Sequence, residues 1–213
     1  IPTIPLEKQY NHPEYEPLWA AAQDLGMPLS LHISTHRFTS PLATISQFTS
    51  SQTDTLRSGG MDMMVGLADR DVPVREAIAA MIFSGVFERY PKLMVGAVEY
   101  EVAWAPYFII EMDRVYKETA FGQLGERFQS GALPSDFFKR NVFISFQQDE
   151  LGMKLLSYFN VDNLMWGSDY PHAEGTFPKS REIVDRIFQG VPEEAKLKIA
   201  GENTARLYHI QAF

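Results

Sequence analysis

The sequence predicts an α/β fold built on a parallel sheet, and three observations lead to that prediction. Four apolar runs of strand length follow one another along the 213 residues, and helix-like stretches separate them. No hairpin signal joins any two of the runs, and strands that alternate with helices pair in parallel through right-handed crossovers. The four units could form an open doubly wound sheet or half of an eight-stranded barrel. No glycine-rich phosphate loop follows a strand, which gives a nucleotide-binding sheet little support.

The predicted strands are short and mostly apolar. They are Pro28–Ser34, Lys92–Glu99, Val142–Phe146 and Leu164–Ser168. Side chains alternate between the two faces of a strand, so the first strand has one apolar and one polar face. The apolar face holds Leu29, Leu31 and Ile33, and the polar face holds Ser30, His32 and Ser34.

Helices are predicted between and around these strands. They are His12–Leu25, Val72–Tyr90, Trp104–Lys117, Glu150–Phe159, Lys179–Phe188 and Pro192–Tyr208. Gly26 ends the first helix, and Pro73 and Pro106 lie in first turns, where proline is tolerated. Residues 36 to 60 contain ten Ser or Thr and show no period, so they are predicted to form a long loop. Long loops in compact domains are often functional.

Composition excludes several classes of protein. The net charge is −8 without a Lys/Arg cluster, whereas nucleic acid binding requires a basic face. No apolar run is long enough to span a bilayer, and the first residues do not resemble a signal peptide. Without cysteine there is no disulfide, no thiol nucleophile and no Cys-built zinc site, so a metal ion would need His and carboxylate ligands. The absence of cysteine fits the cytoplasm.

Candidate site residues come from the ends of the strands, because active sites of parallel α/β folds lie at the C-terminal ends of their strands. Those ends are polar and each offers a metal-ligand type: His32, Glu99 with Tyr100, Gln147 to Asp149, and Asp169 to His172. Imidazole and carboxylate are the usual ligands of zinc or a similar ion when cysteine is absent.

Each candidate also has a purely structural explanation. A lone strand His is usually a hydrogen-bonded core residue, although Ser30 and Ser34 give His32 a polar face. Asp169 could cap the turn before a proline, and Glu99 could pair with an arginine. His36 and Arg37 could be solvated loop residues.

The segment Asn163–His172 (NLMWGSDYPH) favours the functional interpretation of these candidates. It resembles the last barrel strand of the amidohydrolase-related family, in the aminocarboxymuconate-semialdehyde decarboxylase-like branch. In that branch a G-[ST]-D-[YF]-P-H-like turn ends the strand. Three further segments agree in order and spacing. They are Gly26–Ser34, like the fifth strand; Ser84–Trp104, like the helix and sixth strand; and Gly201–Tyr208, like the closing helix.

The resemblance implies a TIM (β/α)₈ barrel of which residues 1–213 form one domain, covering roughly strands 5 to 8. It implies a Zn or Mn ion held by His32 and Asp169, and a small-molecule substrate. The leading function is non-oxidative decarboxylation of a small aromatic or unsaturated carboxylic acid, with Asp169, Glu99 and His172 as catalytic candidates. The alternatives are metal-dependent hydrolysis of an amide, ester or lactone, and a non-catalytic half-barrel binding module.

The sequence departs from the family in two places. No first strand with an H-x-H or E-x-H pair is present, and Glu99-Tyr100-Glu101 stands where many decarboxylases have a catalytic His. We therefore expect a natural protein of about 300 to 400 residues, with the missing N-terminal half of the barrel as its partner and a homodimer as its assembly.

Two expectations concern the surroundings of the site. The loop from His36 to Gly60 should cover its mouth, with His36 or Arg37 binding a substrate carboxylate. The inward faces of the strands should need side chains from the other half of the barrel. Depending on register, the candidates for those inward positions are Val95, Ala97, Ile144 and Met165.

Overall fold

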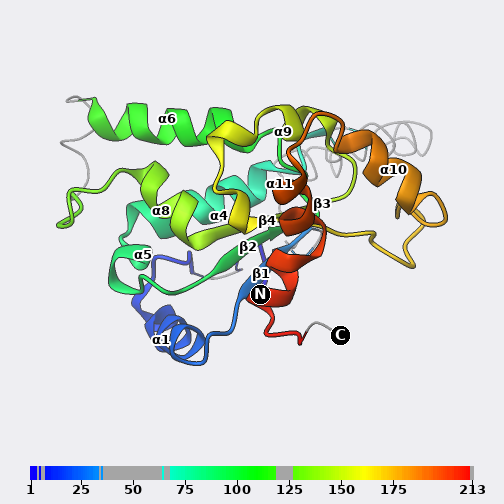
Figure 1. Ribbon diagram of the computed structural model, residues 1–213. Coiled ribbons are helices and arrows are strands. Elements are labelled where there is room, and N and C mark those ends of the chain that lie inside the picture. The colour runs from blue at the N-terminus through cyan, green and yellow to red at the C-terminus, as the bar shows by residue number, and fades with distance from the viewer. Residues whose placement is uncertain are drawn as a thin grey trace, which may run out of the picture.

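A four-stranded parallel sheet forms the centre of the structure, a computed structural model that describes residues 1–3, 5, 8–33, 35, 64, 68–118 and 127–211. The strands pair in the order β1-β2-β3-β4 (Figure 1). They are β1 (Leu29–His32), β2 (Val95–Val98), β3 (Val142–Phe146) and β4 (Leu164–Trp166). Each lies within a predicted run, so the predicted parallel α/β sheet is confirmed.

Helices alternate with the strands, as predicted. Before β1 lies α1 (Glu16–Asp24), and after it come α4 (Val72–Phe83) and α5 (Val86–Arg89). The helices between β2 and β3 are α6 (Ala105–Lys117) and α8 (Pro134–Asn141). The remaining helices are α9 (Glu150–Lys154), α10 (Ser180–Ile187), α11 (Glu193–Leu197) and α12 (Asn203–Leu207).

Several of the predicted helices are interrupted, and Glu150–Phe159, for example, consists of α9 and a separate 3₁₀ turn, Leu156–Tyr158. Gly85 has φ 73° and separates α4 from α5, because a left-handed residue cannot continue a right-handed helix. A π-helical turn, Lys198–Glu202, lies between α11 and α12. The pattern of apolar residues does not reveal such local changes in backbone conformation. The sequence therefore predicted one continuous helix in each place.

Helix α8 was not predicted. Pro134 lies in its first turn, and the Asp136 carboxylate accepts the Leu133 N–H at 2.8 Å, which is half of a capping box. Phe137 and Phe138 bury its apolar face. The Pro-x-Asp start was a readable signal, but the helix has only eight residues and lacks the longer periodic pattern on which the other predictions depended.

The sheet has one extensively buried face, which packs against the helices. Leu29 and Leu31 belong to the large core on this face, as the alternating pattern predicted. The same core contains Val95, Ala97 and Ile144, so their suggested inward orientation is wrong, whereas Met165 does lie on the other face. The register pairs Val95 with Leu29 and Val142, which places them all on the helix side.

The opposite face carries a much smaller apolar group, the inner cluster. It consists of Phe143, Met165 and Leu207, with Met94 and Val98 packed against them. Gly96 is required here, because a Cβ at this position would lie 2.1 Å from the Phe143 ring.

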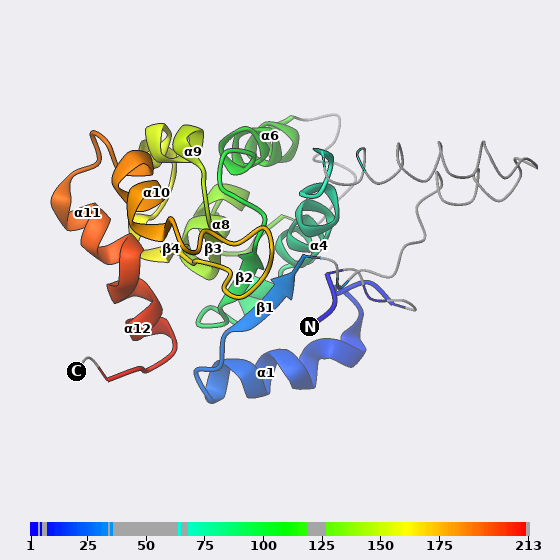
Figure 2. The ribbon, with the colours of Figure 1, turned by 90° about the vertical axis from the view of Figure 1, so that its right-hand side faces the viewer.

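The arrangement is that of one wall of a barrel. Parallel strands follow each other in chain order, whereas a doubly wound sheet reverses its order at a switch point. In Figure 2 the helices form an arc around the sheet, from α4 through α6 and α9 to α10 and α11. The open doubly wound alternative is therefore excluded for the described part of the chain.

Buried asparagines fasten the beginnings of the strands. Asn141 Nδ2 donates to the carbonyls of Pro91 and Leu93 at 3.1 and 2.8 Å, just before β2. Asn203 Nδ2 donates to the carbonyls of Val161 and Leu164, each at 2.8 Å, at the start of β4. These bonds satisfy carbonyls that the sheet leaves unpaired, and they lie at the edge opposite the strand ends that carry the polar candidates.

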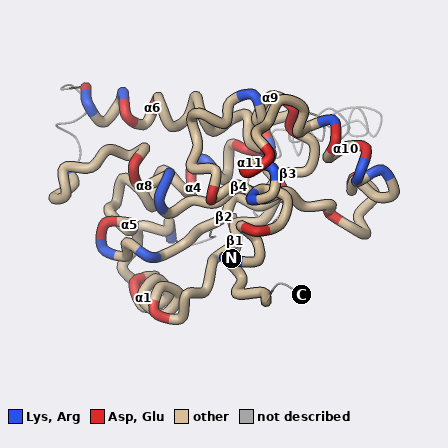
Figure 3. The backbone as a smooth tube through the Cα atoms, in the orientation of Figure 1, with Lys and Arg blue, Asp and Glu red and all other residues tan. Residues whose placement is uncertain are grey.

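Charged residues are interspersed along the outer helices. Figure 3 shows acidic and basic positions together on α5, α6 and α10. Within the described residues, no helix combines the length and the apolar character that a membrane crossing requires.

Candidate active site

The polar candidates lie at the C-terminal edge of the sheet. His32 is the last residue of β1, and the register places it beside Val98, the last residue of β2. Glu99 follows β2 directly, and Asp169 follows β4 after two residues. Since all four strands run in parallel, these residues leave the sheet at the same edge.

His32 and Glu99 are in direct contact. His32 Nε2 lies 3.1 Å from Glu99 Oε1, and His32 Nδ1 lies 2.8 Å from the carbonyl oxygen of Ile33. If Nδ1 carries the hydrogen that the carbonyl accepts, the neutral ring presents a lone pair at Nε2. That lone pair faces a carboxylate oxygen, so a proton or a cation must lie between the two acceptors.

Asp169 and His172 form a second contact. His172 Nδ1 lies 2.8 Å from Asp169 Oδ1, and the His172 N–H donates to the Asp169 carbonyl at 2.9 Å. The Thr176 N–H donates to the Ser168 carbonyl at 2.9 Å and closes this loop. The Asp169 side chain is only 10% exposed, whereas that of His172 is 67% exposed. One partner is therefore fixed in the interior, and the other can exchange protons with solvent.

Glu99 brings the two contacts together into the carboxylate–imidazole cluster, defined here as His32, Glu99, Asp169 and His172. One ligand atom from each of Glu99, Asp169 and His172 lies within 4.8 Å of the other two. Burial raises the pKa of Glu99, with the adjacent Asp169 raising it further and His32 acting in the opposite direction. Two ionised carboxylates at this separation repel by about 3 kcal/mol at an effective dielectric constant of about 20. The cluster thus favours a bound cation.

The backbone is strained where it presents these carboxylates. Glu99 has φ 66° and Asp169 has φ 55°. A left-handed conformation costs a residue with a Cβ about 1–2 kcal/mol, and such residues concentrate at functional sites. The Glu99 N–H donates to Ser145 Oγ at 3.2 Å, which holds the end of β2 against β3.

Tyr100 was a strand-end candidate, but its contact with Thr3 beside Glu99 was not predicted. Tyr100 is buried, and its hydroxyl lies 2.8 Å from Thr3 Oγ1, which also donates to the His32 carbonyl at 2.8 Å. No sequence motif predicts this contact, because Thr3 and Tyr100 are 97 residues apart in sequence.

Glu101, which was not among the predicted site residues, lies outside the cluster and bonds a neighbouring loop. Its carboxylate accepts the N–H groups of Gln147 and Gln148 at 3.3 and 3.4 Å, and Arg70 Nη2 lies 3.8 Å from it. Burial raises the pKa of Glu101, and the nearby Asp149 raises it further. Glu101 therefore joins the loop after β2 to the loop after β3.

Asp149, which was among the strand-end candidates, is occupied by backbone groups. Its Oδ2 accepts the N–H groups of Val102 and Ala103, each at 2.7 Å, and its Oδ1 accepts that of Gly152 at 2.7 Å. The last bond caps the start of α9. These contacts give Asp149 a structural role. The predicted substrate-binding residues His36 and Arg37, and the loop around them, lie outside the described residues.

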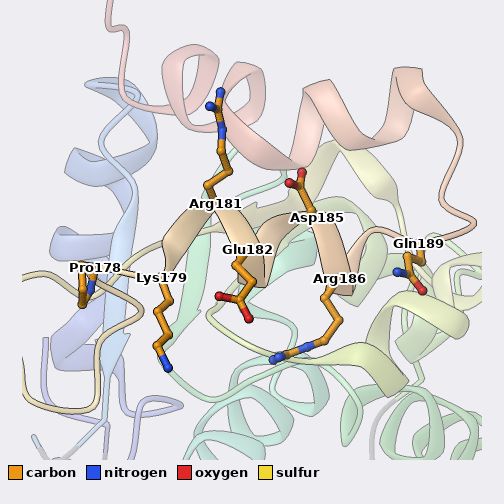
Figure 4. A pocket seen from close by; sticks show the side chains of 7 residues that line it. All are labelled: Pro178, Lys179, Arg181, Glu182, Asp185, Arg186 and Gln189. Carbon is orange, nitrogen blue, oxygen red and sulfur yellow. The ribbon is translucent and has the colours of Figure 1, made fainter.

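A surface groove on the described part of the chain lies away from the cluster. A groove of about 660 Å³ runs along α10, and none of the cluster residues lines it. Figure 4 shows Lys179, Glu182 and Arg186 on one side of α10 and Arg181 with Asp185 on the other. Because these side chains leave α10 in opposite directions, the groove is an open surface. The groups that could bind a metal ion or transfer protons lie in the carboxylate–imidazole cluster instead.

The chain resembles known proteins in both sequence and structure. The sequence matches the amidohydrolase family over residues 2–210, which is nearly its whole length. The chain belongs to the amidohydrolase family. This confirms the family predicted from the NLMWGSDYPH segment. A comparison with curated proteins gives no match.

Solved structures of amidohydrolases share the fold. An amidohydrolase from Mycobacterium avium subsp. paratuberculosis superposes with a TM-score of 0.74 at 23% identity, over 97% of this chain and 50% of that one. For 5-carboxyvanillate decarboxylase from Sphingomonas paucimobilis the TM-score is 0.69 at 21% identity, over 96% and 56%.

A dihydroxybenzoic acid decarboxylase from a Polaromonas species, solved with manganese and the inhibitor 2-nitroresorcinol, gives a TM-score of 0.66 at 15% identity, over 96% and 56% of the two chains. The chain therefore spans about half the length of these solved relatives, and the likeness supports a TIM-barrel architecture.

Proposed function

We propose that this chain is the C-terminal half of a metal-dependent (β/α)₈ barrel, contributing strands 5 to 8, in an enzyme that decarboxylates a small aromatic or unsaturated carboxylic acid. The carboxylate–imidazole cluster at the C-terminal edge of the sheet carries the proposal. Membership of the amidohydrolase family supports it, and so does the likeness to decarboxylases, one of them with bound manganese.

The residues present fit a divalent ion. Asp169 offers a carboxylate that is almost fully buried, and His32 offers the Nε2 lone pair once Nδ1 bonds the Ile33 carbonyl. A histidine whose second nitrogen is hydrogen-bonded is the usual form of a metal-ligating imidazole. Oxygen and imidazole donors suit both zinc and manganese, and the missing ligands would come from the N-terminal half of the barrel.

When bound, such an ion polarises a carboxylate or carbonyl oxygen and lowers the pKa of its bound water to about 7. The residues of this chain supply the proton. His172 is exposed enough to take a proton from solvent, and its contact with Asp169 leads into the cluster. The substrate carbon that bears the carboxylate accepts this proton. The C–C bond then breaks, its electron pair returns to the substrate framework, and CO₂ leaves.

Hydrolysis of an amide, ester or lactone is the second candidate, and the Asp169–His172 contact favours it. Asp169 would take a proton from the attacking water, and His172 at 2.8 Å could accept it from Asp169. Both reactions use the same groups, so products must separate them. The full-length protein, loaded with Mn²⁺ or Zn²⁺, should be assayed with carboxylated phenols for CO₂ release and with aryl esters and lactones for acid release.

His172→Gln provides the matched control for this assay. It removes the proton route while leaving the two proposed metal ligands, so it should abolish turnover without releasing the ion. Acid release without CO₂ from any carboxylated phenol would favour the hydrolase. Binding of a substrate carboxylate by His36 or Arg37 stays a prediction, as does assembly into a homodimer.

A non-catalytic half-barrel module is the remaining alternative. Titration of the full-length protein with Zn²⁺ or Mn²⁺ separates it from the enzyme, because a barrel with one site binds about one ion whereas a module binds none specifically.

A further inference from the structure

Glu99 occupies the middle of the carboxylate–imidazole cluster. Its carboxylate oxygen Oε1 lies 3.1 Å from His32 Nε2. It also belongs to the group with Asp169 and His172 whose ligand atoms lie within 4.8 Å of one another. Glu99 therefore lies beside both of the metal ligands proposed above, in contact with His32 and within 4.8 Å of Asp169, although His32 itself is not part of that close group.

When the His32 ring is neutral and its Nδ1 hydrogen is bonded to the Ile33 carbonyl, Glu99 Oε1 faces the lone pair of Nε2, which is an acceptor. A ligand atom of Asp169, also an acceptor, lies within 4.8 Å of one of Glu99. Ligands of one ion with bonds of roughly 2.0 to 2.2 Å lie close together without any hydrogen between them. A shared cation accounts for this gathering of acceptors, whereas a proton on His32 would account for the contact between His32 and Glu99 alone.

The surroundings fix Glu99 in place. Its backbone is left-handed, its N–H is bonded to Ser145 Oγ, and the adjacent Tyr100 is buried with its hydroxyl on Thr3. A group that carries protons between solvent and substrate gains from exposure, and the His172 side chain is 67% exposed whereas that of Glu99 is 21% exposed. A ligand gains from being held.

We propose that Glu99 coordinates the divalent ion together with Asp169 and His32, and leaves proton transfer to His172. This inference rests on the proposed metal-dependent function. It assigns two carboxylates and one imidazole to the ion from this half of the barrel. Such an oxygen-rich set favours Mn²⁺ more than an all-histidine set does.

The test compares Mn²⁺ binding by the wild-type full-length protein and three variants. Glu99→Gln and Asp169→Asn each remove one proposed ligand. Glu101→Gln is the matched control, since Glu101 is two residues away, partly buried and left-handed like Glu99, but bonds backbone N–H groups outside the cluster. Free Mn²⁺ is followed by its EPR signal during titration, and bound metal is counted after dialysis.

Glu99→Gln is expected to raise the Kd for Mn²⁺ at least about tenfold, since even residues that only orient a ligand contribute 10- to 100-fold. Glu101→Gln should bind as the wild type does. Thermal melts in EDTA provide a second readout. Removing one of two neighbouring carboxylates relieves repulsion, so Glu99→Gln should melt at the same temperature as the metal-free wild type or higher.

Wild-type Mn²⁺ affinity in Glu99→Gln would overturn the inference. If Asp169→Asn loses the metal in the same experiment, the proposed metal site stands and only the role of Glu99 is wrong. If Asp169→Asn also keeps the metal, the proposed function fails with it. A lower melting temperature of Glu99→Gln in EDTA, with unchanged affinity after refolding, would assign Glu99 a structural role instead.

Discussion

Asn141→Ala should destabilise the protein by removing one side chain that fastens two strands. Asn141 is fully buried immediately before β3. Its Nδ2 donates to Leu93 O at 2.8 Å and to Pro91 O at 3.1 Å, and its Oδ1 accepts from Arg140 Nε at 2.9 Å. Alanine removes all three hydrogen bonds, and its side chain has no polar atom to replace them.

The structure sets the size of the effect. The bond to Leu93 is buried, so its carbonyl is left without a partner at a cost of about 1–3 kcal/mol. The bond to Pro91 is partly exposed, and water replaces some of it, leaving about 0.5–1.5 kcal/mol. Together the loss is about 1.5–4.5 kcal/mol of unfolding free energy. At about 2–4 °C per kcal/mol, Tm should fall by about 3–18 °C.

Urea unfolding followed by circular dichroism measures the loss, and Asn141→Asp is the matched control. Aspartate keeps the volume but turns acceptor oxygens toward the two carbonyls, so it should cost at least as much as alanine. An Asn141→Ala protein within about 0.5 kcal/mol of the wild type would refute the assignment, because that is the range of an ordinary surface change.

Two further predictions concern the packing of Gly96 against Phe143 and the partly buried carboxyl group of Glu101. Gly96→Ala should cost about 1–3 kcal/mol, because its Cβ would meet the Phe143 ring at 2.1 Å, and the added change Phe143→Leu should restore much of the loss in thermal melts. Burial raises the pKa of Glu101 above its ordinary 4.5, so the folded state holds this proton more tightly than the unfolded chain does. Its contribution to stability should therefore fall as pH rises from about 4.5 through the raised pKa, and Glu101→Gln should remove that slope from urea melts measured across the range.

Local patterns in the sequence were sufficient to predict the sheet. Alternation in PLSLHIS and the apolar run VFISF predicted β1 and β3, because strand periodicity is a property of adjacent residues. Which face of β2 and β3 packs against the helices was not readable, since these strands are apolar on both faces. Barrel and parallel-sheet strands are buried on both sides, so the faces of Val95, Ala97 and Ile144 had to come from the register.

The candidate site was readable to a similar extent. Strand ends and the GSDYPH turn indicated His32, Glu99, Asp169 and His172, and the structure places Glu99 with Asp169 and His172 and brings His32 onto Glu99. The roles of Tyr100 and Glu101 depend on contacts with Thr3 and the loop after β3, which only the folded chain brings together. The sequence thus predicted the candidate metal-binding and catalytic side chains. The structure was needed to identify the residues that position these side chains and their loops.

The metal content of the full-length protein tests the central proposal most directly. Wild-type protein and its Asp169→Ala variant, purified side by side and dialysed against Mn²⁺ or Zn²⁺, should be analysed for metal per polypeptide. A metal-dependent barrel predicts about one ion for the wild type and a clear loss in the variant, with the fold intact by circular dichroism. Equal metal content in the two proteins, or no specific ion in either, would contradict it.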